Sequence, residues 1–258
     1  MNRLVLRRAG SWLFWLILWQ LASMAVGNAI LLVGPFEVLQ ALFSQAFSQD
    51  FWLTVAGSFG RICLGFLAAF FLGLALGTAA WRFPWVGQLL EPFMSSIRSV
   101  PVASFVILAL IWVGSGYLAV FIAFLVVLPM IYVSTAAGLS SADQKLLEMA
   151  RVFRVPALKR IRFIYLPALT PYLASGCRTA LGMSWKSGIA AEVIGIPSNS
   201  IGEQLYYSKL YLDTAGLFAW TLVIIIVSAL FERGFLLLLG RLSPPAEAGQ
   251  KGGEPNGG

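Results

Sequence analysis

The sequence contains no histidine, so it lacks the side chain that proteins use most often as a metal ligand and as a general base near neutral pH. It has only two cysteines, Cys63 and Cys177, and both lie within apolar segments, where a free thiol behaves as a small buried hydrophobe. These absences argue against a disulfide framework, a metal site and a histidine-based catalytic site. A membrane-embedded enzyme is also disfavoured, because the apolar runs hold no paired acids.

Charged residues are scarce as well. They make up 11% of the 258 residues, against 59% hydrophobic residues, whereas soluble domains carry about a quarter charged residues. This composition indicates an integral membrane protein. The net charge of +7 does not favour a nucleic-acid partner, because the basic residues lie between apolar runs and not along a water-soluble face.

The apolar runs predict an all-α membrane domain over residues 1–242 with six spanning helices, since a helix of about 20 residues crosses the hydrocarbon core. The expected spans are residues 11–33, 52–80, 101–113, 117–138, 169–194 and 215–239. The third is short, so its helix should begin earlier and bend at Pro101, and Gly114 to Gly116 should form a tight turn after it. A cleaved secretory signal is the alternative for the first run, although the run continues past the small residues of a cleavage site.

Basic residues predict the orientation of these spans. Arginines precede the first span, and residues 139–167 hold six bases against two acids, a bias that marks the cytoplasmic side. Both termini and this loop are therefore expected in the cytoplasm, and residues 34–51 and 196–213 outside. Residues 34–51 should form an amphipathic surface helix. The tail at residues 243–258 is rich in Gly, Pro and Glu and is expected to be disordered.

The charged loop at residues 139–167 also carries helical signals. Ser141 stands three residues before Gln144, which predicts a capping box at the start of a helix. Pro156 cannot lie inside that helix but suits the first turn of another. We therefore expect two short helices that meet at a bend near Arg154.

The fifth span is the most polar of the set. Ser175, Thr179, Gly182 and Lys186 follow one another at intervals of four, three and four residues, which places them on one helical face. Such a face in a membrane helix meets protein or a water-filled cavity and not lipid. We expect it to line a translocation path, together with Glu192. Packing of this face against a second copy of the chain is the alternative.

The chain shows no nucleotide-binding site of its own. The nearest approach to a phosphate-binding loop, GMSWKS at residues 182–187, lacks the glycine before Lys186 and lies within a span, where helical N–H groups are already bonded. We expect no cofactor and no enzymatic activity in this chain. A secondary transporter or channel remains the alternative, but that class would be expected to show matching halves or coupling acids, and Glu192 is the main acid in a span.

The loop resembles the cytoplasmic loop of the membrane subunits of bacterial ABC importers. The shared pattern is Glu-Ala-Ala, three residues, Gly, nine residues and Ile-x-Leu-Pro, and the matching residues here are Glu148, Ala150, Ile164, Leu166 and Pro167. Met149 replaces the middle alanine and Arg154 replaces the glycine. If that glycine serves a turn with positive φ, the arginine carries a conformational cost.

The resemblance extends beyond the loop. The segments SFGRICLGF at 58–66, IRSVPVAS at 97–104 and SWKSGIAAEVIG at 184–195 are similar to permeases of the nitrate, sulfonate and taurine type. This implies a homodimer of six-span subunits in the bacterial inner membrane that imports a small anionic solute. An extracytoplasmic solute-binding protein would deliver the solute.

The resemblance also implies two cytoplasmic ATPase subunits, which would use the ATP and dock on the loop. The coupling residues would then be Glu148, Ala150, Arg151, Arg154 and Pro167. We expect Glu148 and Arg151 to make polar contacts with the ATPase and Ala150 to allow its close approach.

Overall fold

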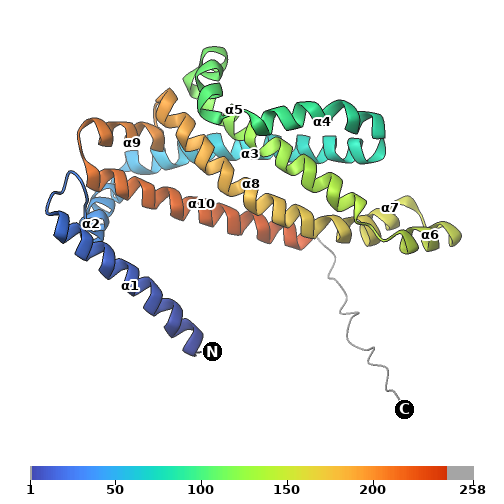
Figure 1. The fold of residues 1–258 in the computed structure, drawn as a ribbon, viewed down its shortest axis with the longest axis horizontal. Coiled ribbons are helices and arrows are strands. Elements are labelled where there is room, and N and C mark those ends of the chain that lie inside the picture. The colour runs from blue at the N-terminus through green and yellow to red at the C-terminus, as the bar shows by residue number, and fades with distance from the viewer. Residues whose placement is uncertain (1, 243–258) are drawn as a thin grey trace. The chain divides into compact units, whose positions relative to one another are not determined.

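The computed structural model describes residues 2–242, and this part of the chain is helical without a β-strand. Its elements (Figure 1) are, in order, α1 (Asn2–Val26), α2 (Pro35–Ala46), α3 (Gln49–Arg82), α4 (Pro84–Ser99), α5 (Val102–Ser140), α6 (Gln144–Val152), α7 (Ala157–Arg160), the π-helix η1 (Ile161–Tyr165), α8 (Leu166–Gly195), α9 (Ile201–Leu210) and α10 (Thr214–Leu242). The all-α class is confirmed. The tail at 243–258, expected to be disordered, lies outside the described residues.

Among the described helices, three are long and apolar enough to cross a membrane: Gln49–Arg82, Val102–Ser140 and Thr214–Arg241. α8, with 30 residues, is also long enough to cross a membrane, but polar residues along one of its faces interrupt the apolar run. These helices confirm the prediction of a membrane protein. The count of six spans stays a prediction.

α5 combines the expected third and fourth spans. Gly114 has φ +73° and ψ 170°, which interrupts the helix where the turn was predicted. The residues on either side form a hairpin, in which Val106 and Ala109 are buried with Leu118, and the rings of Phe105 and Phe121 stack with centroids 6.1 Å apart. The expectation that this helix begins earlier and bends at Pro101 is wrong, because Pro101 is the extended N-cap of α5 and α4 already ends at Ser99.

The first predicted span extends too far. α1 ends at Val26, because Gly27 adopts the left-handed conformation with φ +61° and ends the helix. The chain then turns back on α1, where Trp19 Nε1 donates a hydrogen bond to the carbonyl oxygen of Val33 at 2.9 Å. Residues 27–33 are therefore a turn and not a continuation of the helix, although their side chains are largely apolar. A helix is present within residues 34–51 as α2, which ends at Ala46 before α3 begins at Gln49, while its place on the membrane surface stays a prediction.

The chain forms two compact units. Of the described residues, unit 1 contains 2–65, 102–123 and 185–229, and unit 2 contains 66–101, 124–184 and 230–242. Each unit is described by itself below. The loop helices α6 and α7 belong to unit 2, and α9 belongs to unit 1.

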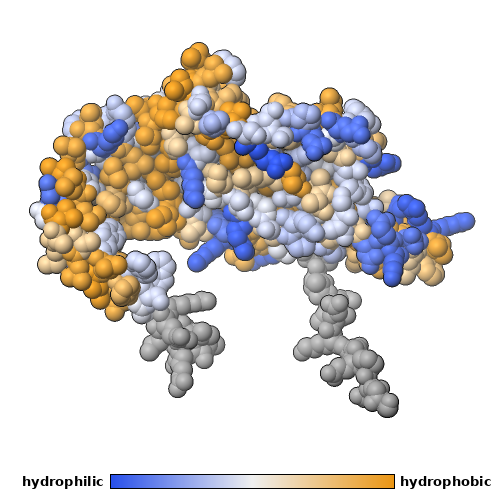
Figure 2. All heavy atoms as spheres, viewed as in Figure 1, coloured by the Kyte–Doolittle hydropathy of each residue, from blue (hydrophilic) through white to orange (hydrophobic). Residues whose placement is uncertain are grey.

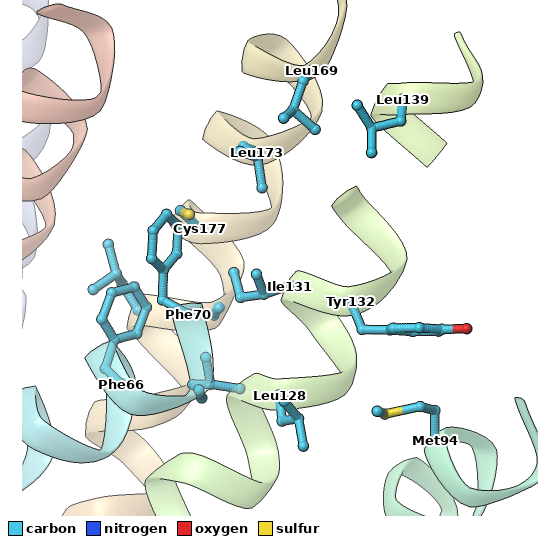
Figure 3. Packing of buried hydrophobic residues seen from close by; sticks show 14 residues of the cluster. Phe66, Phe70, Met94, Leu128, Ile131, Tyr132, Leu139, Leu169, Leu173 and Cys177 are labelled. Carbon is cyan, nitrogen blue, oxygen red and sulfur yellow. The ribbon is translucent and has the colours of Figure 1, made fainter. Parts of the chain in front are cut away.

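The core of unit 2 is built from apolar residues at helical spacing on four helices. Phe70 of α3, Ile131 of α5 and Cys177 of α8 converge in its centre, and Met94 of α4 faces Tyr132 (Figure 3). Two glycines allow α3 to lie close to α5. A Cβ atom at Gly77 would lie only 2.7 Å from Thr135 Cβ, and one at Gly73 only 2.9 Å from Ile131 Cβ. This packing holds the helices that carry the loop.

Candidate functional site

The first loop helix is α6, and it begins later than the sequence suggested. Its N-cap is Asp143, whose carboxylate accepts a hydrogen bond from the Lys145 N–H at 2.9 Å. Ser141 instead closes α5, and its Oγ donates to the carbonyl oxygen of Gly138 at 2.8 Å. The predicted capping box at Ser141 is therefore wrong, because α5 is still helical at the preceding residue.

The turn after α6 has the backbone conformation of a glycine. Arg154 has φ +49°. Its N–H donates to the Arg151 carbonyl at 3.1 Å, and the Val155 N–H donates to the Ala150 carbonyl at 2.9 Å. This pair of bonds is a Schellman motif, which ends helices with a left-handed residue. Arg154 thus keeps the conformation that favours glycine, at a cost of about 1 kcal/mol or more, and the predicted bend is confirmed.

The second predicted loop helix is continuous with the fifth predicted span. Pro156 is the N-cap of α7, which runs through η1 into α8. In η1 the turn is wider, and the Leu166 N–H donates to the Ile161 carbonyl. Pro167 follows directly. Because proline has no backbone N–H, the wide turn leaves no donor unpaired at this position. It marks the point where the loop joins α8.

The two faces of α6 differ in exposure. Ala150 is only 4% exposed and lies against its own chain. Glu148 and Arg151 are exposed, and so are Val152 and Phe153, at 78% and 74%. In this chain Ala150 faces inward, and its expected role in the close approach of the ATPase stays a prediction. The outward face is instead apolar with charged neighbours, and Figure 2 shows hydrophilic residues gathered over α6 and α7.

In unit 2, part of the polar face of α8 lines a groove of about 420 Å³. Ser175 and Thr179 are exposed there, with Ser134 of α5 and Arg98 of α4 on the other walls. A Cβ atom at Gly182 would meet no described atom within 4 Å, so this position is open too. Sequence reasoning missed Arg98, although it stands in the segment IRSVPVAS that carries the resemblance.

In unit 1, the α8 residues Lys186 and Glu192 have opposite environments. Lys186 is exposed, as expected of a residue on the open face. The Glu192 side chain is 0% exposed. Its carboxylate is enclosed by hydrogen-bond donors of its own chain, and its expected place on a translocation path stays a prediction.

These donors come from two helices, α3 and α9. Ser58 Oγ donates to Glu192 Oε2 at 2.6 Å, the Gly202 N–H donates to the same oxygen at 3.2 Å, and Arg61 Nη1 donates to Oε1 at 3.3 Å. Arg61 Nη2 also donates to the Ser198 carbonyl at 2.8 Å. The carboxylate therefore ties the segment around the start of α9 to α3 and α8.

The matches to known proteins agree on one class. The family described as "Binding-protein-dependent transport system inner membrane component" matches residues 62–243. The taurine transport system permease protein TauC of Escherichia coli is 29% identical, over 88% of this chain and 84% of that protein. The putative aliphatic sulfonates transport permease protein SsuC of Bacillus subtilis is 28% identical, over 87% and 81%. The bicarbonate transport system permease protein CmpB of Synechococcus elongatus is 30% identical, over 69% and 68%.

Proposed function

The chain belongs to the family of binding-protein-dependent transport system inner membrane components, and from this premise we propose that it is the permease subunit of an ABC importer for a small anionic solute. The relatives named for taurine, aliphatic sulfonates and bicarbonate support this solute class, because each name denotes a compound with an acidic oxyanion group. ATP hydrolysis is assigned to separate cytoplasmic ATPase subunits, and delivery of the solute to an extracytoplasmic binding protein.

The observation that carries the proposal is the exposed apolar face of α6. Met149, Val152 and Phe153 are 51%, 78% and 74% exposed on a short helix in a basic loop. Exposed apolar residues that adjoin one another on a polar surface mark a protein-binding site. We assign this face to the ATPase, with Glu148 and Arg151 as its polar contacts. Ala150 packs against its own chain on the opposite face of α6, and the left-handed turn at Arg154 ends the helix.

The translocation path is assigned to the open face of α8 in a homodimer. In unit 2 this face is open to the groove at Ser175 and Thr179, and it is also open at Gly182. Lys186 is exposed further along the helix. Among the described residues, Arg98 in the groove forms no ion pair with an acid. An unpaired cation in a groove attracts anions and disfavours cations, which fits an anionic solute.

The test is docking of the ATPase on α6. The exposed Val152 is changed to Lys, since a cation near the C-terminal end of a helix is tolerated and no packing within the chain is lost. We expect Val152→Lys to reach the membrane at wild-type levels and to reduce co-purification of the cognate ATPase subunit and solute-stimulated ATP hydrolysis about tenfold. Lys159→Ala, an exposed change on α7, should leave both unchanged.

Wild-type co-purification of the ATPase with Val152→Lys would place docking away from this face. Uptake by the wild-type protein that needs no ATP and no ATPase would favour a secondary transporter or channel.

A further inference from the structure

A second basic cavity lies within unit 2, away from the groove at Arg98. It has a volume of about 860 Å³ and is lined by arginines from three helices: Arg82 at the end of α3, Arg151 of α6 and Arg160 of α7. None of the described residues that line it is acidic. Arg151 is assigned above to the ATPase contact, whereas Arg82 and Arg160 have no role in the proposed transport path or in docking.

The charge of these arginines is not balanced within the described chain. None of the three forms an ion pair with a described acid. The Nε of Arg160 is in addition buried and has no hydrogen-bond acceptor among the described residues. A buried N–H donor without an acceptor is costly, and like charges in one cavity repel one another. Both observations indicate an anion that is bound here in the membrane.

We propose that this cavity binds a phosphate group, supplied either by an acidic phospholipid or by free inorganic phosphate. Guanidinium groups match the oxygens of phosphate in a bidentate geometry, and arginine is the residue that proteins favour for this purpose. Gln144 and Tyr165 line the same cavity and add neutral donors. The volume lies within the range of about 300–1,000 Å³ that small ligands occupy.

The surroundings favour a phospholipid as the source. The cavity lies at the end of the candidate span Gln49–Arg82, beside the basic loop that the charge rule predicts on the cytoplasmic side. Trp81 and Tyr165 line it with their rings in edge contact, 5.1 Å between centroids, and such aromatic residues are enriched at the headgroup level. Leu74 and Leu169 also line it and offer apolar surface for acyl chains. Basic pockets of this kind bind anionic headgroups in other membrane proteins.

The test uses the purified, delipidated full-length permease in a neutral detergent. Phosphatidylglycerol, phosphatidylcholine or inorganic phosphate is added, and the thermal midpoint and the bound phospholipid phosphorus are measured. We expect phosphatidylglycerol to raise the midpoint and to be retained, and phosphatidylcholine to do neither. Protection by inorganic phosphate at millimolar concentration would identify the free anion as a source.

The variants decide whether the cavity is the site. Arg160→Gln and Arg82→Gln should each weaken phosphatidylglycerol binding about tenfold or more, because each removes a charge-assisted hydrogen bond. Arg160→Lys keeps the positive charge but loses the bidentate donor geometry of the guanidinium group. Its affinity for phosphatidylglycerol should therefore lie between those of wild type and Arg160→Gln. Lys159→Gln is the matched control, since Lys159 is exposed beside the cavity and does not line it. Arg151 stays unchanged, so that a failure here is distinct from a failure of ATPase docking.

Two results would overturn the proposal. One is a wild-type protein that distinguishes neither phosphatidylglycerol from phosphatidylcholine nor phosphate from chloride. The other is an affinity for phosphatidylglycerol that is equal in wild type, Arg160→Lys and the glutamine variants that fold.

Discussion

At the residue scale, one backbone angle sets the direction in which the chain leaves α6. The left-handed φ of Arg154 directs two N–H groups back to the carbonyls of Ala150 and Arg151, which would otherwise lack partners at the end of α6. The Arg154 side chain is exposed, and packing therefore does not offset the conformational cost. The left-handed turn gives the loop its geometry, and an arginine in this conformation lowers the stability of the turn relative to a glycine.

We predict that Arg154→Gly stabilises the permease by about 1 kcal/mol, because glycine adopts positive φ without strain. The thermal midpoint in detergent should rise, and uptake should be retained. Lys159→Gly, a change within the right-handed helix α7, should lower stability by a similar amount. A lower midpoint for Arg154→Gly would mean that the arginine side chain stabilises the loop by more than the turn costs.

Arg98 is the second position with a specific expectation. Arg98→Gln removes the cation from the groove that Ser175 and Thr179 line, and solute uptake per membrane-inserted permease should fall about tenfold. Arg98→Lys should retain more activity, because it keeps the charge. Uptake of labelled taurine, an alkanesulfonate and bicarbonate in a deletion strain measures both variants. Arg162→Gln, which changes an exposed arginine outside this groove, serves as the control. Equal uptake by Arg98→Gln and wild type would exclude Arg98 from the path.

At the element scale, the Glu192 carboxylate connects three helices of unit 1. α8 supplies the acid, α3 supplies Ser58 and Arg61, and Gly202 near the start of α9 supplies a backbone N–H. The small Gly202 is required there, since a Cβ atom on it would overlap the Glu192 Cβ. A buried carboxylate held by several donors stabilises this arrangement only while its partners are present.

We predict that Arg61→Met destabilises the permease by roughly 3 kcal/mol, because it leaves the buried Glu192 carboxylate without its counter-charge. Glu192→Gln in the same chain should recover part of this loss, since the amide carries no charge. Thermal midpoints of the two single variants and the double variant form a double-mutant cycle. Strictly additive effects would show that Arg61 and Glu192 do not depend on each other.

At the scale of the whole molecule, the prediction concerns the sides of the membrane. Basic residues place the loop at residues 139–167 in the cytoplasm and α2 and α9 outside. Single cysteines at Gln45, Ser115 and Ser200, in a variant without Cys63 and Cys177, should react with a membrane-impermeant thiol reagent in intact cells. A cysteine at Ala157 should react only after the cells are opened. Labelling at Ala157 in intact cells would contradict this topology.

The helical class and most of the helix positions could be predicted from the amino-acid sequence alone. The expected spans at 52–80, 169–194 and 215–239 correspond to α3, α8 and α10, because long apolar runs are a local property of the chain. The turn at Gly114 and the bend at Arg154 were also predictable, since glycine and proline act on the backbone where they stand. The motif in the loop at residues 139–167 indicated the importer class for the same reason, because it too is a short, local pattern in the sequence.

Which side chains are enclosed, and which partners they meet, depends on how distant segments pack together. Glu192 and Ala150 were assigned to functional surfaces, yet both are buried. Ser58, the partner that donates to Glu192, is 134 residues away in the chain, and Arg98 meets the α8 face through the packing of α4. Helical periodicity places residues on a face but does not say what covers that face. That depends on contacts between segments far apart in the sequence, which no local pattern encodes.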